Sequence, residues 1–339
     1  MTENLDDGAA ALVHAAATAG HAPSIHNTQP WRWHVRPGLL DLYAVRDRQL
    51  AVTDPDGRLL TISCGTALQH VTVALAAAGW AATVTRFPGD DPDHLARIEV
   101  TGRVPVAADA VRHVQTIQVR HTDRRPVTDT PVGAGALDAI AKAAGDYGVH
   151  LHYLRPDQVV GLASAASRAQ EAEGLDEQWR AELAIWAGAA LGAGIPDVGP
   201  AGHVVGTGVP PTVIPATAPQ TTVPARDFGE PGTLPVDAGH DLAAQYAILY
   251  GEEDTPAHWL RAGEALSAAW LTATELGVSV VPMSAAVEVD GTRHELRRLL
   301  AGVGYPYLAA RFGIADPHQA GPPHTPRLPA EQTITYDEA

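Results

Sequence analysis

Two long apolar helical stretches at distant places in the chain end in the same way, and this repetition constrains the fold more than any other feature. The stretches span residues 64–79 and 262–277, and a segment rich in β-formers follows each of them, at 83–85 and 278–281. Their common residues share an offset of 198 (263 − 65 = 198): Gly65 with Gly263, Leu68 with Leu266, and Gly79 with Gly277. Glycine readily ends a helix because it tolerates positive φ. The repeat therefore predicts two related α+β halves packed together.

A second pair of segments agrees with this division. The helical run at 8–20 is echoed at 133–145, and an alternating apolar–polar segment follows each run, at 31–35 and 149–154. Such alternation is typical of a strand with one buried face. We expect an α+β fold of two halves, residues 1–112 and 113–339, each with an antiparallel-type sheet flanked by helices.

Composition excludes several classes of function. The formal charge of −16 argues against nucleic acid or an anionic membrane as partner. A single cysteine, Cys64, rules out an intramolecular disulfide and a cysteine-based zinc site, and we expect it to be a small core residue. His150 and His152 share one strand face but lack a ligand partner at suitable spacing, so no metal site is predicted. The apolar run at 9–19 is too short to span a bilayer and follows an acidic flank, so a cytoplasmic location is expected.

A polar loop separates the first helical run from the first strand. It reads Ala22-Pro23-Ser24-Ile25-His26-Asn27-Thr28-Gln29-Pro30-Trp31. Its hydroxyl and amide groups offer several donors and acceptors in a small space, which suits a planar heterocycle with amide-like edges. The alternative is an ordinary capped turn, because Ser and Asn start helices and turns in many proteins. His26 lies within the loop, and the sequence leaves its direction open.

A second polar segment, residues 120–127, joins the two halves. Its three arginines and one hydroxyl, Arg120, Thr122, Arg124 and Arg125, stand before a predicted helix. Arginine binds phosphate oxygens in bidentate fashion, so the segment is a candidate anion cradle. A solvated basic loop is the alternative.

These motifs resemble those of the nitroreductase superfamily, FMN enzymes that are normally homodimers. Pro-Ser-x-x-Asn-x-Gln-Pro-Trp is similar to the family's flavin-contacting loop, and Arg-x-Thr-x-Arg at 120–124 is similar to its second flavin signature. The stretch 276–284 resembles the family segment that meets the flavin N5 edge, and 325–329 resembles its terminal arm. The resemblance implies that FMN is bound by Pro23, Ser24, Ile25, Asn27, Gln29, Arg120, His121, Thr122, Arg124, Met283, Ser284, Ala285 and Arg327.

The order of the motifs implies a fused pseudo-dimer. In a nitroreductase dimer, each FMN meets the arginine motif of one subunit and the Pro-Ser loop of the other. Here the first half has only the loop and the second half only the arginine motif, since residues 146–149 (Asp-Tyr-Gly-Val) stand where a second loop would lie. This arrangement resembles the Acg-type flavoproteins and implies one FMN per chain, bound without a second subunit.

An insertion rich in glycine and proline interrupts the second half at about residues 191–236. A long segment without periodicity is usually a lid, a binding loop or a disordered region. The mixture of apolar residues with Arg226-Asp227-Phe228 is unlike disorder, and we favour a lid over the flavin. Trp179 and Trp186 precede it at helical spacing and are expected to pack within a helix.

The resemblance also implies a function. The flavin would carry the chemistry, so no catalytic side chain is assigned. We expect an oxidoreductase that takes electrons from NAD(P)H and reduces nitro compounds, quinones or other small electron-poor molecules, or that desaturates a metabolite. The alternative is a flavin-sequestering protein whose lid excludes substrates.

Overall fold

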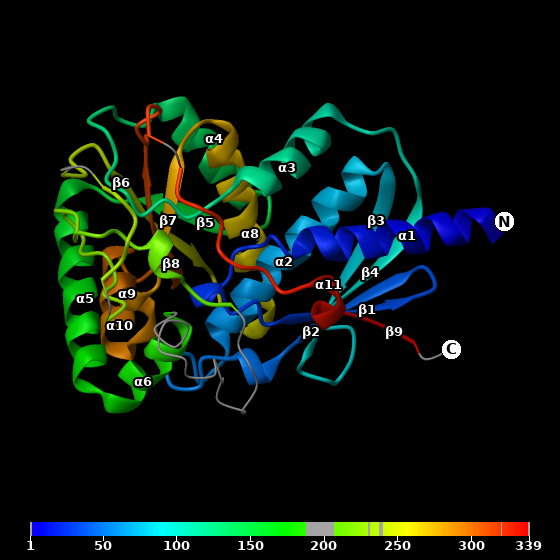
Figure 1. Cartoon of the computed structure of the whole chain (residues 1–339), viewed down its shortest axis with the longest axis horizontal. Coiled ribbons are helices and arrows are strands. Elements are labelled where there is room, and N and C mark those ends of the chain that lie inside the picture. Colours follow the sequence, from blue (N-terminus) through cyan, green and yellow to red (C-terminus); the bar gives the residue numbers. More distant parts are fainter. Residues whose placement is uncertain (1, 188–206, 230, 237–239, 320, 338–339) are drawn as a thin grey trace.

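The computed structural model describes residues 2–187, 207–229, 231–236, 240–319 and 321–337, which form two β-sheets with helices between and around them (Figure 1). The helices of the described residues are α1 (Thr2–Ala19), α2 (Arg58–Ala77), α3 (Ala108–Val119), α4 (Ala134–Gly145), α5 (Pro156–Leu175), α6 (Glu177–Trp186), α8 (Pro256–Glu275), α9 (Ala285–Glu288), α10 (Asp290–Leu299) and α11 (Ala330–Thr333). The strands are β1 (Trp31–Arg36), β2 (Leu39–Ala44), β3 (Trp80–Arg86), β4 (His94–Arg103), β5 (His150–Tyr153), β6 (Gln245–Gly251), β7 (Ser279–Met283), β8 (Tyr305–Gly313) and β9 (Ile334–Tyr336).

The described strands form two sheets, and every strand of the first sheet except β9 comes from residues 1–112. The first sheet has the order β3-β4-β2-β1-β9 and the second has the order β5-β6-β8-β7. Among the described residues, every pairing within these two sheets is antiparallel except that of β1 with β9, in which Trp33 lies opposite Ile334. The expected α+β class with antiparallel sheets is therefore confirmed. The parallel strand, β9, comes from the far end of the chain.

The two repeated helices, α2 and α8, pack against each other at the centre of the molecule (Figure 1). Gly65 and Gly263 face each other there. A Cβ on Gly65 would overlap the backbone carbonyl of Leu260, and a Cβ on Gly263 would overlap that of Ile62. These two carbonyl residues are again 198 positions apart, which is the pattern of a two-fold related contact. In agreement, Ser267 donates a hydrogen bond to Gln69 across the same offset of 198 residues.

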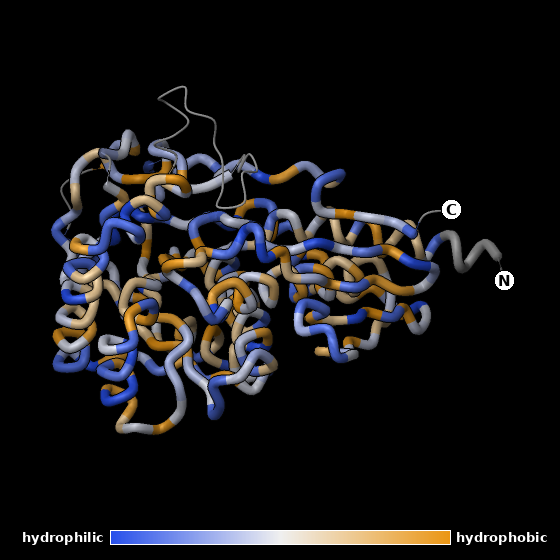
Figure 2. Tube along the Cα trace, turned by 90° about the horizontal axis from the view of Figure 1, so that it is seen from below, coloured by the Kyte–Doolittle hydropathy of each residue, from blue (hydrophilic) through white to orange (hydrophobic). Residues whose placement is uncertain are grey.

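Alternation along β1 buries one face of the first sheet. Trp31, Trp33 and Val35 are at most 6% exposed, whereas Arg32 between them faces solvent. They pack with the inner faces of α1 and α2 in one cluster, and a second cluster fills the other half around β6, β8 and α8. Hydrophobic stretches accordingly run through both halves in Figure 2.

The end of the chain joins the halves. After β8 the chain crosses from the second half to the first and adds β9 beside β1 (Figure 1). The expected boundary between residues 112 and 113 falls inside α3, which continues from Ala108 to Val119.

One helix in the described part of the chain, α2, is long and apolar enough to cross a membrane. Because 83% of its apolar window is buried inside the protein, α2 is a core helix here.

Candidate functional site

A cavity of about 770 Å³ lies where the two halves meet. Segments that are far apart in the sequence enclose it. They are the Pro-Ser loop (residues 22–31), α2, the arginine segment (residues 120–127), the described part of the insertion, α8, the end of β7 and the terminal arm (residues 325–329). Nearly every residue expected at the flavin lines this cavity, with Gln29 as the exception: Pro23, Ser24, Ile25, Asn27, Arg120, His121, Thr122, Arg124, Met283, Ser284, Ala285 and Arg327.

The Pro-Ser loop has an uncommon backbone. His26, Asn27 and Gln29 all have positive φ, at 43°, 58° and 48°. Such angles are rare outside glycine and accumulate at functional sites. The loop is held by the hydroxyl of Ser24, which accepts a hydrogen bond from the Gln29 backbone N–H at 2.9 Å, and by that of Ser63, which accepts one from Ile25 at 3.0 Å. The loop is thus an ordered turn held by two serine hydroxyls, and several of its residues line the cavity.

Gln29 holds the terminal arm and does not face the cavity. Its side-chain NH₂ donates to the Pro326 carbonyl at 3.1 Å, and its side-chain oxygen accepts from the Leu328 N–H at 2.9 Å. Asn27 also binds the arm: its NH₂ donates to Pro326 at 2.8 Å, and its Oδ1 accepts from Arg327 Nη1 at 2.9 Å. The inference from family resemblance placed both amides at the cofactor. In the structure, both fix the position of Arg327.

Arg120, which is buried, and Arg327, which is half-buried, form a cationic pair at one end of the cavity. The Nε of each is buried without a hydrogen-bond partner, and among the described residues no carboxylate lies within ion-pair distance of either. Burial, together with the charge of Arg327, lowers the pKa of Arg120 to about 9, and burial lowers that of Arg327 to about 10. Trp270 lies under the Arg120 guanidinium at 4.6 Å. Unneutralised guanidinium groups with buried N–H donors are what an anion site requires.

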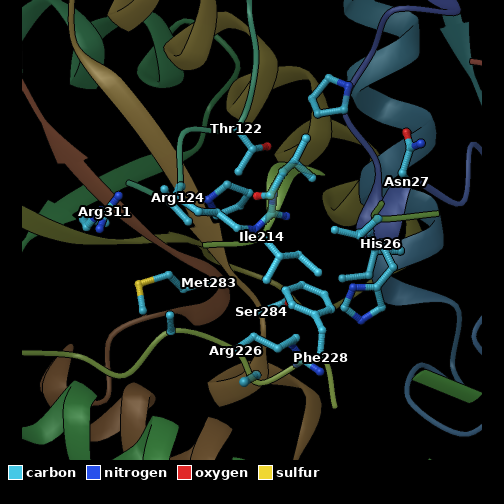
Figure 3. A pocket seen from close by; sticks show the side chains of 18 of the residues that line it. His26, Asn27, Thr122, Arg124, Ile214, Arg226, Phe228, Met283, Ser284 and Arg311 are labelled. Atoms are coloured by element: carbon cyan, nitrogen blue, oxygen red, sulfur yellow. The ribbon is translucent and has the colours of Figure 1, made fainter. Parts of the chain in front are cut away.

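Arg124 occupies a different part of the cavity. Its guanidinium lies 5.5 Å from the ring of Phe228 and donates to the Val213 carbonyl at 3.4 Å. Burial lowers its pKa to about 10, with the charge of Arg311 as a smaller cause. The three arginines expected at the flavin therefore divide into a pair and a single residue, and Figure 3 places Arg124 near Thr122.

The arginine segment lies after a helix, whereas the sequence predicts it directly before one. α3 ends at Val119, and α4 begins only at Ala134. Arg125 also differs from expectation: it is buried and makes a bidentate ion pair with Asp123, at 2.8 and 2.7 Å. Arg125 precedes a proline and lies outside the arginine pattern of the resemblance, which predicts a surface position. This prediction is wrong, because the pair is enclosed by the protein, and neither Arg125 nor Asp123 lines the cavity.

The opposite wall forms where β7 ends and α9 begins. Met283, the last residue of β7, and Ser284 and Ala285, where α9 starts, all line the cavity. A helix start here turns the chain sharply. This turn brings the three residues across from the Pro-Ser loop (Figure 3).

We call residues 207–229 and 231–236 the cover segment. It is the described part of the expected insertion, whose residues 191–206 and 230 lie outside the described residues. The cover segment has one side on the cavity, and most of the residues there are apolar: Val209, Val213, Ile214, Pro215, Ala216, Ala218, Pro219, Val223, Pro224, Ala225, Phe228 and Pro231. It is attached near its start, where Asn27 donates to Gly208 at 3.0 Å and Arg48 donates to Thr207 at 2.6 Å.

His26 lines the cavity beneath the cover segment. Its ring meets that of Phe228 edge to face, with centroids 5.9 Å apart, and its Nε2 is buried without a partner (Figure 3). Burial and, secondarily, the charges of Arg226 and Arg124 hold its pKa well below the usual value, so the imidazole is neutral at physiological pH.

Several lining residues could not be selected from the sequence. Ser63 and Thr66 lie on one face of α2 at helical spacing inside an apolar run, a signal that polar side chains meet a cavity there. Trp270, Gln170 and Phe228 carry no local signal, because only packing brings them to the site.

The residues that the sequence analysis set aside, Cys64, His150 and His152, do not line the cavity. Cys64 is buried in the core, and burial raises its pKa. His150 is exposed, His152 contacts Gln158 at 3.2 Å, and the described residues contain no cluster that could hold a metal ion.

Comparison with known proteins finds relatives over almost the whole chain. A Mycobacterium tuberculosis protein named "Putative NAD(P)H nitroreductase" is 40% identical over 329 residues, which is 94% of this chain and 90% of the relative. A second one from the same organism, "Putative NAD(P)H nitroreductase acg", is 31% identical over 326 residues, 94% of each chain. An uncharacterised M. tuberculosis protein is 32% identical over 337 residues, 95% of this chain and 92% of its own. No family model matches the chain.

The chain is also similar to solved structures of nitroreductases, at low sequence identity. An FMN-dependent nitroreductase of Mycobacterium smegmatis, solved with NADPH, has 18% identity and a TM-score of 0.40, covering 68% of this chain and 99% of its own. A nitroreductase of Bacteroides fragilis with bound FMN has 16% identity and a TM-score of 0.36, covering 63% and 93%.

Proposed function

Because this chain belongs to the nitroreductase superfamily, we propose that it is an FMN-dependent oxidoreductase that accepts electrons from NAD(P)H and passes them to small electron-poor molecules such as nitro compounds or quinones. The observation that carries this proposal is the cavity itself. It assembles the Pro-Ser loop of one half with the arginine motif of the other, and it has a cationic pair without carboxylate partners at one end.

The cationic pair fits the phosphate of FMN. A phosphate monoester carries between one and two negative charges near neutral pH and has several acceptor oxygens. The unpartnered Nε groups of Arg120 and Arg327 are donors that such an anion would satisfy, which removes the cost of burying them alone. Asn27 and Gln29 support this end by fixing the arm that carries Arg327.

The rest of the cavity would hold the flavin ring. When bound, FMN supplies hydride transfer at its N5 atom. Thr122 and Arg124 line the cavity and would meet a polar edge of the ring, and the turn from Met283 to Ala285 would form the opposite wall. The apolar cover segment excludes water from this space.

His26 is our candidate for contact with the substrate. It reaches the cavity from a strained backbone position, and the cover segment lies directly against its ring. A neutral imidazole can donate or accept a hydrogen bond without adding charge to an apolar compartment. This property suits the oxygen atoms of a nitro group or a quinone.

Mixing the purified flavoprotein with NADH or NADPH in the absence of oxygen tests the proposal. Rapid bleaching of the flavin absorbance, followed by its return when a quinone is added, is the expected result. A protein that carries no flavin, even after incubation with FMN, would contradict the assignment of the site.

Flavin sequestration is the second candidate, and the attachments of the cover segment favour it. Contacts with both halves hold this segment over the cavity, among them those of Asn27 with Gly208 and of Arg226 with Glu173. A protein of this kind would bind FMN and show no bleaching with either nucleotide.

A further inference from the structure

A buried cluster of three charged side chains joins the cover segment to the body of the protein. Arg226, from the cover segment, lies between Glu173 near the end of α5 and Glu288 at the end of α9. Its Nη1 donates to Glu173 at 3.1 Å, and its Nη2 makes a short ion pair with Glu288. All three side chains are at most 9% exposed.

The cluster has one carboxylate more than its cation can neutralise. Two ionised carboxylates with one guanidinium would leave a net negative charge in a buried place, which is costly. One oxygen of Glu288, Oε1, is in addition buried without a partner. A single proton held on the two carboxyl groups removes the excess charge.

We propose that Glu173, Arg226 and Glu288 form a proton-dependent latch that holds the cover segment closed over the cavity and releases it as the pH rises. Arg226 is the moving part, because it belongs to the cover segment and its side chain lines the cavity. The two carboxyl groups are the fixed part, since α5 and α9 pack against each other.

The electrostatics of Glu173 support the release of the cover segment as the pH rises. Burial, opposed by Arg226 and reinforced by the neighbouring Glu288, raises the pKa of Glu173 to about 8. With the cover segment open, Glu173 would meet solvent, so the largest cause of the raised pKa is removed; its pKa falls toward the ordinary value of about 4.3, although Glu288 stays beside it. The closed form therefore binds the proton more tightly, and closure is strongest at low pH. Between those two values each unit of pH raises the open-to-closed ratio by up to tenfold, and above about pH 8 the ratio levels off.

Other ionisable groups lie near the latch. Asp54 faces Glu288 from the loop before α2, and burial raises its pKa to about 6. His26 faces Arg226 and is neutral. A comparison between wild type and Glu173→Gln removes the contribution of both groups, because they are the same in the two proteins. Gln has the size of a protonated Glu and cannot ionise, so this variant should stay closed at every pH.

Trypsin gives a readout that does not require flavin. The Arg226 side chain is buried when the cover segment is closed, so cleavage after Arg226 reports the open population. At each pH from 6 to 9, the wild-type cleavage rate is divided by that of Glu173→Gln, which cancels the pH dependence of trypsin itself. We expect this ratio to rise up to tenfold per unit to about pH 8 and then level off. A ratio independent of pH would overturn the latch.

The release of FMN gives a second readout, which rests on the proposed function. FMN should leave the wild-type holoprotein faster as the pH rises, while Glu173→Gln should release it slowly throughout. Arg226→Met, which leaves two carboxyl groups without their cation, should release FMN fastest, and acid should restore retention. If the wild type and Glu173→Gln show the same pH profile in both readouts, the latch is wrong even if FMN binds. If no FMN binds, the trypsin result still decides the latch.

Discussion

At the scale of single residues, the terminal arm depends on its contacts with the first half. Arg327 reaches the cavity because Asn27 accepts its hydrogen bond at 2.9 Å and the Ala22 carbonyl accepts another at 3.1 Å. The charge of Arg327 is thus positioned by residues about 300 places earlier in the chain. Cofactor binding should therefore respond to changes in both segments.

We expect Arg120→Ala and Arg327→Ala each to weaken FMN binding about ten- to a hundredfold. A charge-assisted contact contributes roughly 1.5–3 kcal/mol, and about 1.4 kcal/mol is a factor of ten. Asn27→Ala removes a support of Arg327 and should weaken binding about tenfold or less. Titration of the apoprotein with FMN measures these constants.

Arg32→Ala is the matched control, because Arg32 is exposed on β1. Arg124→Ala should weaken binding in the same range as the pair, through the ring end of the cavity. If both members of the pair can be removed without loss of affinity, the phosphate site lies elsewhere.

The ion pair of Arg125 with Asp123 gives a prediction about stability. Both side chains are at most 7% exposed, so Arg125→Ala leaves a buried carboxylate without its partner. We expect a loss of about 3 kcal/mol in the free energy of unfolding. Urea denaturation at neutral pH measures it.

Arg155→Ala provides the comparison. Arg155 pairs with Asp157 on the surface, where the two side chains are 64% and 69% exposed, so its loss should change stability by less than about 1 kcal/mol. Equal effects of the two substitutions would show that burial of the Arg125 pair has no energetic consequence.

At the scale of elements, the crossing of α2 and α8 determines how the halves meet. Gly65→Ala would place a methyl group on the Leu260 carbonyl, and the helices would have to separate. Overpacking of this kind typically costs about 1–3 kcal/mol. A lower melting temperature, with flavin bound more weakly because both halves line the cavity, is the expected result.

Gly135→Ala in α4 serves as the control for the same chemical change. A Cβ at Gly135 would meet no atom within 4 Å, so Ala should stabilise the helix by about 0.5–1 kcal/mol. Destabilisation by both substitutions would contradict the role of the helix crossing.

At the scale of the whole molecule, the two-fold relation between the halves predicts the flavin content. Thr66 lines the cavity, and its equivalent 198 residues later is Glu264. Glu264 is 1% exposed and is engaged by Arg86 through two hydrogen bonds of 2.8 Å. A buried ion pair at the equivalent position leaves no place for a second flavin there. We expect at most one FMN per chain, measured by absorbance after denaturation, and a ratio near two would refute the composite site.

A single chain should also be sufficient for binding, because both halves that line the cavity belong to it. Sedimentation at decreasing protein concentration, followed at the flavin absorbance, tests this. Flavin that stays with the monomer is expected. Loss of flavin in step with dissociation of an oligomer would show that a second chain completes the site.

The sequence by itself determined part of the elements and the segments that carry the site. The helices α1, α2, α4 and α8 and the strands that follow them, β1, β3, β5 and β7, followed from local periodicity and glycine positions, and the expected internal repeat followed from the constant offset of 198 between Gly65 and Gly263. Motif chemistry selected the Pro-Ser loop, the arginine segment and the arm, all of which line one cavity. These features depend on residues close together in the chain, so a pattern can reveal them.

Only the tertiary structure decided what each polar side chain does. Arg124 and Arg125 are neighbours of the same type, yet one lines the cavity and the other is buried in a pair with Asp123. Gln29 belongs to the motif and holds the arm, whereas Arg226, which belongs to no motif, binds two carboxyl groups from α5 and α9. The physical reason is that the partner and the burial of a charged group depend on segments hundreds of residues away, and local sequence does not encode these contacts.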